Sequence, residues 1–211
     1  MILTILGAPG AGKGTMAKLI AKKLNIPTIS TGALLRDEIG SGSELGEEIN
    51  ALISKGNFVP DEMITPILVK RIQSDDCKNG YILDGFPRNE AQAENLPNIG
   101  INLSKALLIE VSDKDIITRL VGRRECPKCR TTFHITYSPP QKAGICDNCG
   151  SELKIRPDDK EEIILNRLEI YHNETEPLIQ YFKDNALLVS VKGENEIHDT
   201  RENVFKALNI L

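Results

Sequence analysis

The chain contains the stretch MILTILGAPGAGKGT at residues 1–15, where a short apolar run is followed by a glycine-rich turn. Residues 1–6 have the length and composition of a buried strand that ends at Gly7. Apolar residues then recur at helical spacing from Met16 to Leu24. A glycine-rich turn between a strand and a helix directs backbone N–H groups and the helix N-terminus toward an anion. The stretch therefore predicts a phosphate-binding loop; a chance glycine-rich turn is the alternative, and the flanking elements argue against it.

One position of this loop departs from the general pattern. Lys13 is placed to reach the terminal phosphates of a nucleotide, but Gly14 follows it where Ser or Thr is usual. The hydroxyl comes one residue later, at Thr15. A magnesium ion would then depend less on the loop hydroxyl and more on water and an acid such as Asp84.

The rest of the chain alternates apolar runs with helical periodicity. This alternation predicts an α/β protein, a three-layer P-loop fold with a central parallel sheet covered on both faces. Two segments, near residues 30–60 and 123–158, interrupt the alternation. Further strands are expected at 81–84, 106–111 and 187–191. Helices are expected from residue 31 onward and at 45–53, 61–72 and 159–182. Two more helices are expected, one after an N-cap at Asp113 and one after a cap near Asp199 or Thr200.

Composition limits the functional classes. The chain has 211 residues, of which 40% are hydrophobic, enough for one sizeable core. It lacks an apolar run that could span a bilayer and a recognisable signal peptide, so we expect a cytoplasmic protein without a membrane partner. The net charge of −4 and an aromatic content of 4% argue against nucleic-acid binding.

Four of the five cysteines form two C-x2-C pairs separated by sixteen residues, Cys126/Cys129 and Cys146/Cys149. This spacing is typical of a tetrahedral zinc site, and four thiolates leave no open position, so the metal would be structural. Two disulfides, or four unrelated thiols, are the alternative. Cys77 lies outside the quartet and is expected only to pack.

Five motifs, in this order, resemble those of bacterial-type adenylate kinases with a long zinc-binding lid, within the nucleoside monophosphate kinase family. They are the loop at 7–15, Ser30-Thr31-Gly32 with Arg36, the stretch 80–88 (GYILDGFPR) with Gln92, Gly122-Arg123-Arg124 before the cysteine quartet, and Arg156-Pro157-Asp158-Asp159 with Arg167.

The resemblance implies reversible, Mg²⁺-dependent phosphoryl transfer, ATP + AMP = 2 ADP, by direct in-line transfer with lid closure, in a monomer that also carries one structural Zn²⁺. It divides the chain into a core (1–29, 60–122 and 160–211), an AMP-binding insertion (30–59) and a zinc-containing lid (123–159). The partners would be ATP, AMP and ADP.

The resemblance also implies roles for individual residues. ATP would be bound by the loop and the lid: Gly10, Ala11, Gly12, Lys13, Gly14, Thr15, Arg119, Arg123, Thr132, Phe133 and Asn195. AMP would be bound by Thr31, Gly32, Arg36, Asn57, Phe58, Val59, Gly85, Phe86, Pro87, Arg88, Gln92, Arg156 and Arg167. The catalytic set would be Lys13, Arg88, Arg123, Arg156 and Arg167, and Asp84 would act through the water shell of magnesium. Because Arg119 and Arg123 are four residues apart, we expect them on one helix face.

These residue types suit the chemistry. A phosphate acceptor is mostly anionic at neutral pH, since its second pKa is about 6, so no general base is needed. The task is to bring two polyanions together and stabilise spreading negative charge, which planar guanidinium groups do well. Segments that close would exclude water and prevent hydrolysis of ATP.

The sequence departs from the family's motifs at two positions and leaves two rival functions open. Ala33 stands where many relatives carry an acid, and Asn89 is commoner in pyrimidine-nucleotide relatives. The nearest rival is a UMP/CMP-type kinase, against which Thr31 and Gln92 favour adenine. The other is a zinc-ribbon nucleic-acid binder switched by ATP, which leaves Arg88 and Arg156 without a role.

Overall fold

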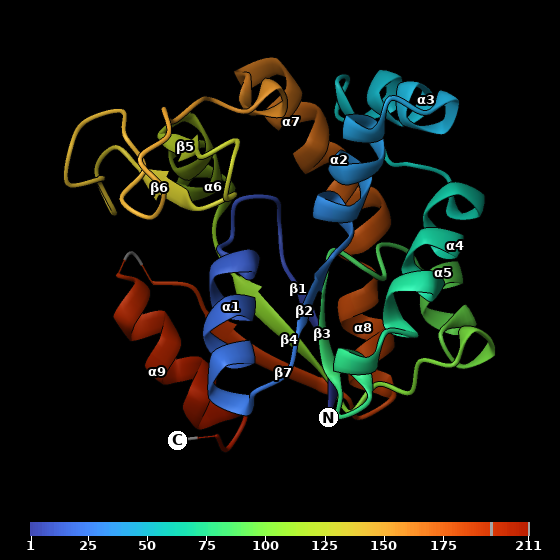
Figure 1. The fold of residues 1–211 in the computed structure, drawn as a ribbon. Helices are drawn as coiled ribbons and strands as arrows, with labels where there is room; N and C mark the ends of the chain where they lie inside the picture. The colour runs from blue at the N-terminus through green and yellow to red at the C-terminus, as the bar shows by residue number, and fades with distance from the viewer. Residues whose placement is uncertain (195, 211) are drawn as a thin grey trace.

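The structure is a computed structural model that describes residues 1–194 and 196–210. Its centre is a five-stranded parallel sheet with the strand order β2-β3-β1-β4-β7 (Figure 1). The strands are β1 (Ile2–Leu6), β2 (Thr28–Ser30), β3 (Tyr81–Asp84), β4 (Lys105–Glu110) and β7 (Leu188–Lys192). This architecture confirms the predicted α/β class and parallel sheet.

Helices cover both faces of the sheet (Figure 1). Leu3 and Ile5 of β1 pack into one core with α1 and α9, whereas Leu6 packs into another core with α5 and α8. Successive strand residues point to opposite faces, so an unbroken apolar run is what a strand covered on both sides requires. The helices are α1 (Lys13–Leu24), α2 (Thr31–Ser41), α3 (Glu44–Ile53), α4 (Asp61–Ile72), α5 (Glu90–Asn95), α6 (Asp113–Val121), α7 (Glu161–Ile170), α8 (Leu178–Asp184) and α9 (Ile197–Ala207).

The register brings three strand ends together. Ile5 is paired with Asp84, and Ser30 is paired with the same residue from the other side. Because parallel strands end at one edge of a sheet, the loop after β1, the start of α2 and the turn after Asp84 lie side by side. Ligands bind at this carboxyl edge in open α/β sheets.

Two segments stand outside the sheet. The helical insertion (residues 30–59) contains α2 and α3, and its Leu35 and Ile49 share a buried core with α4 and β3. The cysteine insertion (residues 123–159) contains the antiparallel pair β5 (Arg123–Glu125) and β6 (Thr132–His134), together with a small core of its own. Figure 1 shows these insertions on either side of the carboxyl edge of the sheet.

Two expected helix caps and one expected helix face are wrong. The N-cap of α6 is Ser112, whose hydroxyl accepts from the Asp115 N–H at 3.2 Å, and Asp113 is the first helical residue. Helix α9 begins at Ile197, before either expected cap, and the Thr200 hydroxyl instead accepts from the Glu194 N–H. Because α6 ends at Val121, Arg123 lies in β5 and does not share a helix face with Arg119.

The periodic stretch at 159–182 is not one helix. Helix α7 ends at Ile170, a π-helical turn follows at Tyr171–Thr175, and α8 begins after Pro177. The short helix α5 was not expected, although Asn89 caps it by accepting from the Gln92 N–H at 2.8 Å. In the part of the chain that the structure describes, none of the helices has the length and apolarity needed to cross a membrane.

Candidate functional site

The glycine-rich loop between β1 and α1 is shaped by backbone conformations that favour glycine. Gly10 has a φ of +89°, and a Cβ there would lie 2.8 Å from Leu120 Cγ. Gly12, the N-cap of α1, also has a left-handed backbone conformation and provides no capping side chain. The first turn of α1 carries no acidic residue. The first N–H groups of α1 are therefore left to bind an anion at the positive end of the helix.

Lys13 lies over this loop. Its ammonium donates to the carbonyl oxygens of Gly7 at 2.7 Å and Ala8 at 2.9 Å. Burial lowers its pKa to about 8, and the nearby Asp84 carboxylate only partly opposes this effect. Among the described residues, no carboxylate forms an ion pair with it, so an anion brought to the loop would meet an uncompensated charge.

A cavity of about 910 Å³ opens above the loop and is lined by residues of the sheet edge and both insertions. Basic side chains from several separate segments of the chain line it. They are Lys13, Lys18, Arg36, Arg71, Arg88, Arg119, Arg123, Arg130, Arg156 and Arg167. In an acidic protein this is a strong local concentration of positive charge, which low-dielectric walls make more effective.

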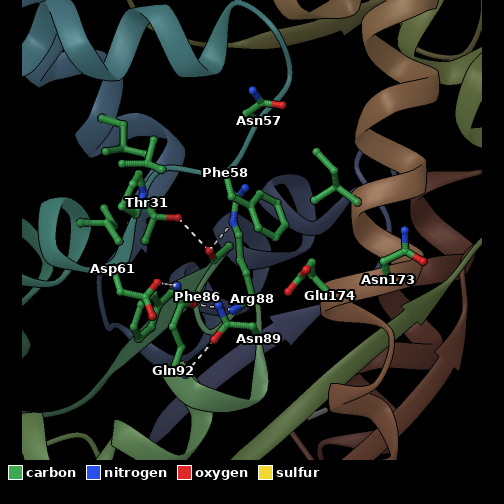
Figure 2. A pocket seen from close by; sticks show the side chains of 16 residues that line it. Thr31, Asn57, Phe58, Asp61, Phe86, Arg88, Asn89, Gln92, Asn173 and Glu174 are labelled. Carbon is green, nitrogen blue, oxygen red and sulfur yellow. Dashed lines mark hydrogen bonds between the residues drawn. The ribbon is translucent and has the colours of Figure 1, made fainter.

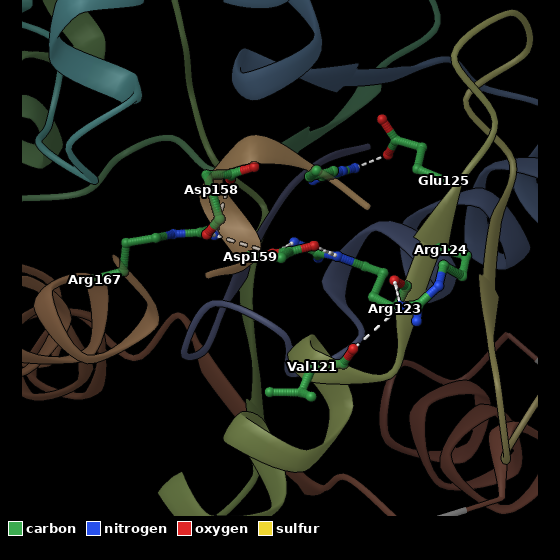
Figure 3. A network of polar contacts seen from close by, with 8 residues as sticks. Val121, Arg123, Arg124, Glu125, Asp158, Asp159 and Arg167 are labelled. Carbon is green, nitrogen blue, oxygen red and sulfur yellow. Dashed lines mark hydrogen bonds and ion pairs between the residues drawn. The ribbon is translucent and has the colours of Figure 1, made fainter. Parts of the chain in front are cut away.

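Three of these arginines are held by acids of the cysteine insertion (Figure 3). Arg123 Nε donates to Asp159 Oδ2 at 2.7 Å, and Arg167 Nη1 pairs with Asp158 Oδ2 at 2.9 Å. Arg156 pairs with Glu125. These contacts fix the directions of the guanidinium groups, which reduces the ordering cost when a ligand binds.

Arg36 and Arg88 are different, because neither forms an ion pair with a carboxylate among the described residues. Burial is the main reason that the pKa of each guanidinium is lowered. Burial also lowers the pKa of Arg167 to about 10, although Asp158 opposes it. The Nε atoms of Arg36 and Arg156 are buried without a hydrogen-bond partner. Buried donors of this kind are costly unless an anion satisfies them.

A smaller cavity of about 390 Å³ adjoins the first and shares Leu35, Asn57, Phe58, Val59, Gly85 and Arg88 with it (Figure 2). Its wall is mostly apolar, with a few fixed polar groups, as small-molecule sites generally are. The Thr31 hydroxyl donates to the Gly85 carbonyl at 2.9 Å, and Arg88 Nε donates to the same oxygen at 2.8 Å. The Arg88 guanidinium also lies 5.0 Å from the centre of the Phe58 ring.

The residues expected at the ATP line the larger cavity. The loop residues Gly10 to Thr15 and the side chains of Thr132 and Phe133 all border it. Arg119 lines it too, and its Nη2 donates to the Glu194 carbonyl at 2.9 Å. Asn195, expected beside the ATP, lies outside the described residues.

The residues expected at the AMP divide between the two cavities. The smaller cavity is lined by Thr31, Asn57, Phe58, Val59, Gly85, Phe86, Arg88 and Gln92. The larger cavity is lined by Gly32, Arg36, Pro87, Arg156 and Arg167. The fold thus brings residues that lie far apart in the sequence to two adjoining cavities.

Sequence reasoning missed three contributors. Asp61 accepts a hydrogen bond from Gln92, Glu125 holds Arg156, and Arg130 reaches from the cysteine insertion to the helical insertion. Each acts on a partner at least 31 residues away, so no local pattern could have indicated it. Asn89 differs, because an Asn before a short helix is a recognised capping signal.

The groups at Asp84 fit a hydrated magnesium ion. This carboxylate ends β3 and faces the loop, since a Cβ on Gly14 would lie 3.2 Å from Asp84 Oδ2. A side chain after Lys13 would therefore crowd the carboxylate. Carboxylate and hydroxyl oxygens are ligands that Mg²⁺ prefers, and Thr15 follows Gly14 directly.

The four cysteines of the cysteine insertion form one cluster. All four Sγ atoms lie within 4.8 Å of one another, and the Cys126–Cys149 and Cys129–Cys146 pairs are 3.3 and 3.5 Å apart. A tetrahedral zinc ion with Zn–S bonds of about 2.3 Å would separate the sulfurs by about 3.8 Å, whereas a disulfide needs about 2.05 Å. The cysteines are free thiols, and their spacing fits a closed structural zinc site.

The two C-x2-C turns have the same backbone structure. The Arg130 N–H donates to the Cys126 carbonyl at 2.9 Å, and the Gly150 N–H donates to the Cys146 carbonyl at 2.8 Å. Both Arg130 and Gly150 are left-handed, with φ of +57° and +71°. Hydrogen bonds with the hydroxyls of Thr131 and Ser151 are the main cause that lowers the pKa of Cys129 and Cys149, which favours their thiolates, whereas burial raises the pKa of Cys146 to about 11.

Comparison with known proteins agrees with this geometry. The family model described as adenylate kinase matches residues 5–187. Proteins named adenylate kinase from Caldicellulosiruptor saccharolyticus and Caldicellulosiruptor bescii are each 50% identical over 214 residues, covering 100% of both chains. One from Acetivibrio thermocellus is 48% identical over 213 residues, covering 99% of this chain and 98% of the relative. With the nucleotide-sized cavities and the cysteine cluster, this similarity over the whole length means that the chain belongs to the adenylate kinase family.

Proposed function

We propose that the chain catalyses reversible phosphoryl transfer between ATP and AMP, ATP + AMP = 2 ADP. The observation that carries this proposal is a set of buried cations between two adjoining cavities, Lys13, Arg36 and Arg88, which form no ion pair with an acid in residues 1–194 and 196–210. One cavity includes the phosphate loop and the other has the size and apolar wall suited to a base. Family membership supports the same activity.

Each group has a task that follows from its position. The loop amides and Lys13 would bind the phosphates of ATP, while Arg36 and Arg88 would bind the phosphate of AMP. Arg123, Arg156 and Arg167 would stabilise the charge that spreads over the transferred group. The acceptor oxygen is already mostly ionised at neutral pH, so the residues position two anions and need not remove a proton.

The insertions would exclude water. We propose that residues 30–59 form the AMP-binding insertion and residues 123–159 the lid, with the core formed by 1–29, 60–122 and 160–211. The lid contributes Arg123 and Arg156 to the larger cavity, and the acids that orient them belong to the same segment. Closure would therefore deliver these guanidiniums together with their positioning groups.

Two ions complete the proposal. Asp84 would hold Mg²⁺ through water molecules. A bound Mg²⁺ would neutralise phosphate charge during transfer. Cys126, Cys129, Cys146 and Cys149 would hold one structural Zn²⁺. Reduced thiolates of this kind favour a reducing, cytoplasmic compartment.

The proposed partners are ATP, AMP and ADP. Both cavities are lined within one chain, which is consistent with a monomer. The convergent arginines face a cavity, and the net charge is −4, so the protein is not suited to binding nucleic acid or an anionic membrane surface.

The test measures ADP formation from Mg²⁺-ATP with AMP, CMP and UMP as acceptors, and the zinc content of the same sample. We expect AMP to be the preferred acceptor and one zinc ion per chain. A preference for CMP or UMP would assign a pyrimidine-nucleotide kinase. Salt-sensitive binding of RNA without phosphoryl transfer would replace the enzyme with a nucleic-acid binder.

A further inference from the structure

The smaller cavity contains one side chain whose two hydrogen-bonding ends are both held by the protein. The Gln92 amide is buried, and its helix is fixed by the Asn89 cap. The Arg88 N–H donates to Gln92 Oε1 at 2.7 Å, and Gln92 Nε2 donates to Asp61 Oδ1. Figure 2 shows Asp61 and Gln92 facing each other at this wall.

These two partners permit only one orientation of the amide. A backbone N–H cannot accept a hydrogen bond, and an ionised carboxylate cannot donate one. Turning the Gln92 amide by 180° would place Oε1 against the Asp61 carboxylate and the NH2 group against the Arg88 N–H. The orientation is thus set by groups whose polarity is unambiguous.

The fixed amide leaves one free N–H and one free lone pair in a defined order. A 6-aminopurine offers the complementary order at its edge, a ring nitrogen that accepts beside an amino group that donates. A 6-oxopurine offers the reverse, a ring N–H beside a carbonyl oxygen. A site that is built for one pattern rejects the other strongly because buried partners remain unpaired.

We propose that Asp61 is a specificity-determining residue, which selects a 6-aminopurine over a 6-oxopurine nucleoside monophosphate by holding the Gln92 amide in one orientation. It is a positioning residue, because it acts through Gln92. The inference rests on the proposed function, in which the smaller cavity receives the base of AMP. Asp61 is suited to this role because it starts α4, and the fold brings it to Gln92 across 31 residues of sequence.

The experiment compares AMP with IMP, which differ in the 6-substituent and in whether the adjacent ring nitrogen carries a proton, as acceptors for Mg²⁺-ATP. Asp61→Asn keeps the shape but can present either an oxygen or an NH2 group to Gln92. Replacing a charge-assisted hydrogen bond by a neutral one roughly halves its strength. We expect the ratio of kcat/KM for AMP to that for IMP to fall about tenfold, mostly through KM, with the KM for ATP unchanged.

Glu62→Gln is the matched control, since it removes the same charge from the same first turn of α4 at an exposed position. It should leave the ratio unchanged. Gln92→Met supplies the second control: in that background Asp61→Asn should no longer change the ratio. If Asp61→Asn unfolds the protein, as thermal melting would show, Asp61→Ser is tested instead.

An unchanged ratio in the Asp61 variant, or an equal fall in the Gln92→Met background, would overturn the inference. Failure of the wild-type protein to phosphorylate AMP would instead overturn the proposed function. The two failures are distinguishable because the wild-type reaction is measured in the same assay.

Discussion

Arg130 joins the two insertions directly: its Nη1 donates to the Ala33 carbonyl at 3.0 Å, and its Nη2 pairs with the Asp37 carboxylate. Arg130 stands in the first C-x2-C turn in a left-handed conformation that the second turn gives to Gly150. A non-glycine residue there costs about 1–2 kcal/mol. Glycine could not make the contact with α2, which connects the cysteine insertion to the helical insertion.

The first prediction concerns this link. Arg130→Gly removes the strain and the contact together, so the melting temperature should not fall, while KM for both nucleotides should rise by up to about fivefold. The rise is small because exposed ion pairs contribute about 1 kcal/mol or less, and Asp37 is 65% exposed. Asp37→Asn should raise KM without affecting the C-x2-C turn. Unchanged KM values in both variants would mean that the link does not contribute to nucleotide binding.

The second prediction follows from Lys13, whose pKa burial lowers to about 8. The protonated form binds phosphate, so kcat/KM for ATP should fall as the pH rises above about 8. The profile of kcat should fall at a higher pH, because bound phosphate favours the protonated form. Lys22→Gln, at an exposed position of α1, serves as the control and should keep the profile. A kcat/KM that stays flat to pH 9.5 would contradict the assignment.

Replacing Lys13 by Met should lower kcat/KM by about a hundredfold or more, the usual loss when one charged donor to the transition state is removed. The fold should remain, because the hydrogen bonds that the ammonium makes to described residues are those to Gly7 and Ala8 within its own loop. Turnover and circular dichroism measured on one sample test both statements. Turnover close to that of the wild type would show that the loop is not the phosphate site.

Removal of zinc from the proposed site should affect the cysteine insertion alone. Its core contains Cys126, Phe133, Cys146 and Leu153, so apolar burial is small without the metal. After treatment with a chelator, hydrogen exchange should rise in residues 123–159 and stay low in the sheet, while activity at low temperature is less affected than thermal stability. Immediate loss of activity with unchanged exchange would indicate a catalytic metal.

His172 should make stability depend on pH. Its Nδ1 lies 2.7 Å from Glu176 and its Nε2 lies 3.0 Å from Asp113, and these hydrogen bonds, that of Glu176 first, raise its pKa. The stabilisation is therefore complete below the ordinary pKa of about 6.5 and is lost as the pH rises through the raised value. His172→Gln should lower the free energy of unfolding at pH 6 by about 1 kcal/mol at most, since the ring is exposed, and by less at pH 8.5.

His198→Gln is the control for this comparison, because His198 contacts a single carboxylate at 3.4 Å. The difference in free energy of unfolding between His198→Gln and the wild type should be the same at pH 6 and at pH 8.5. A His172→Gln effect that is the same at pH 6 and pH 8.5 would contradict the role of the protonated ring.

The sequence predicted elements whose signals are local. Residues 1–15 indicated the first strand, loop and helix, and the spacing of Cys126, Cys129, Cys146 and Cys149 indicated their cluster. The end of α6 was missed because Arg119 and Arg123 fit a helical spacing, although Gly122 ends the helix between them. Periodicity alone does not show where a helix stops when no proline follows.

Contacts that depend on the tertiary fold could not be predicted. Glu125 and Asp61 look like ordinary surface acids in the sequence, and only the folded chain brings them to Arg156 and Gln92. Asn89 was interpreted as a family difference, but the structure shows it as a helix cap. Its amide oxygen therefore serves the backbone of α5 and gives no support to a pyrimidine substrate.

The separate core of the cysteine insertion has a consequence for how the stability of this protein would respond to oxidation. The helical insertion shares its apolar packing with α4 and β3, whereas the cysteine insertion depends on sulfur atoms for its interior. An oxidant that joined these sulfurs in pairs would contract the cluster and leave no site for the proposed zinc ion, yet leave the parallel sheet untouched. Oxidation would then loosen the cysteine insertion well before the sheet unfolded, and a reductant with fresh zinc would restore its stability.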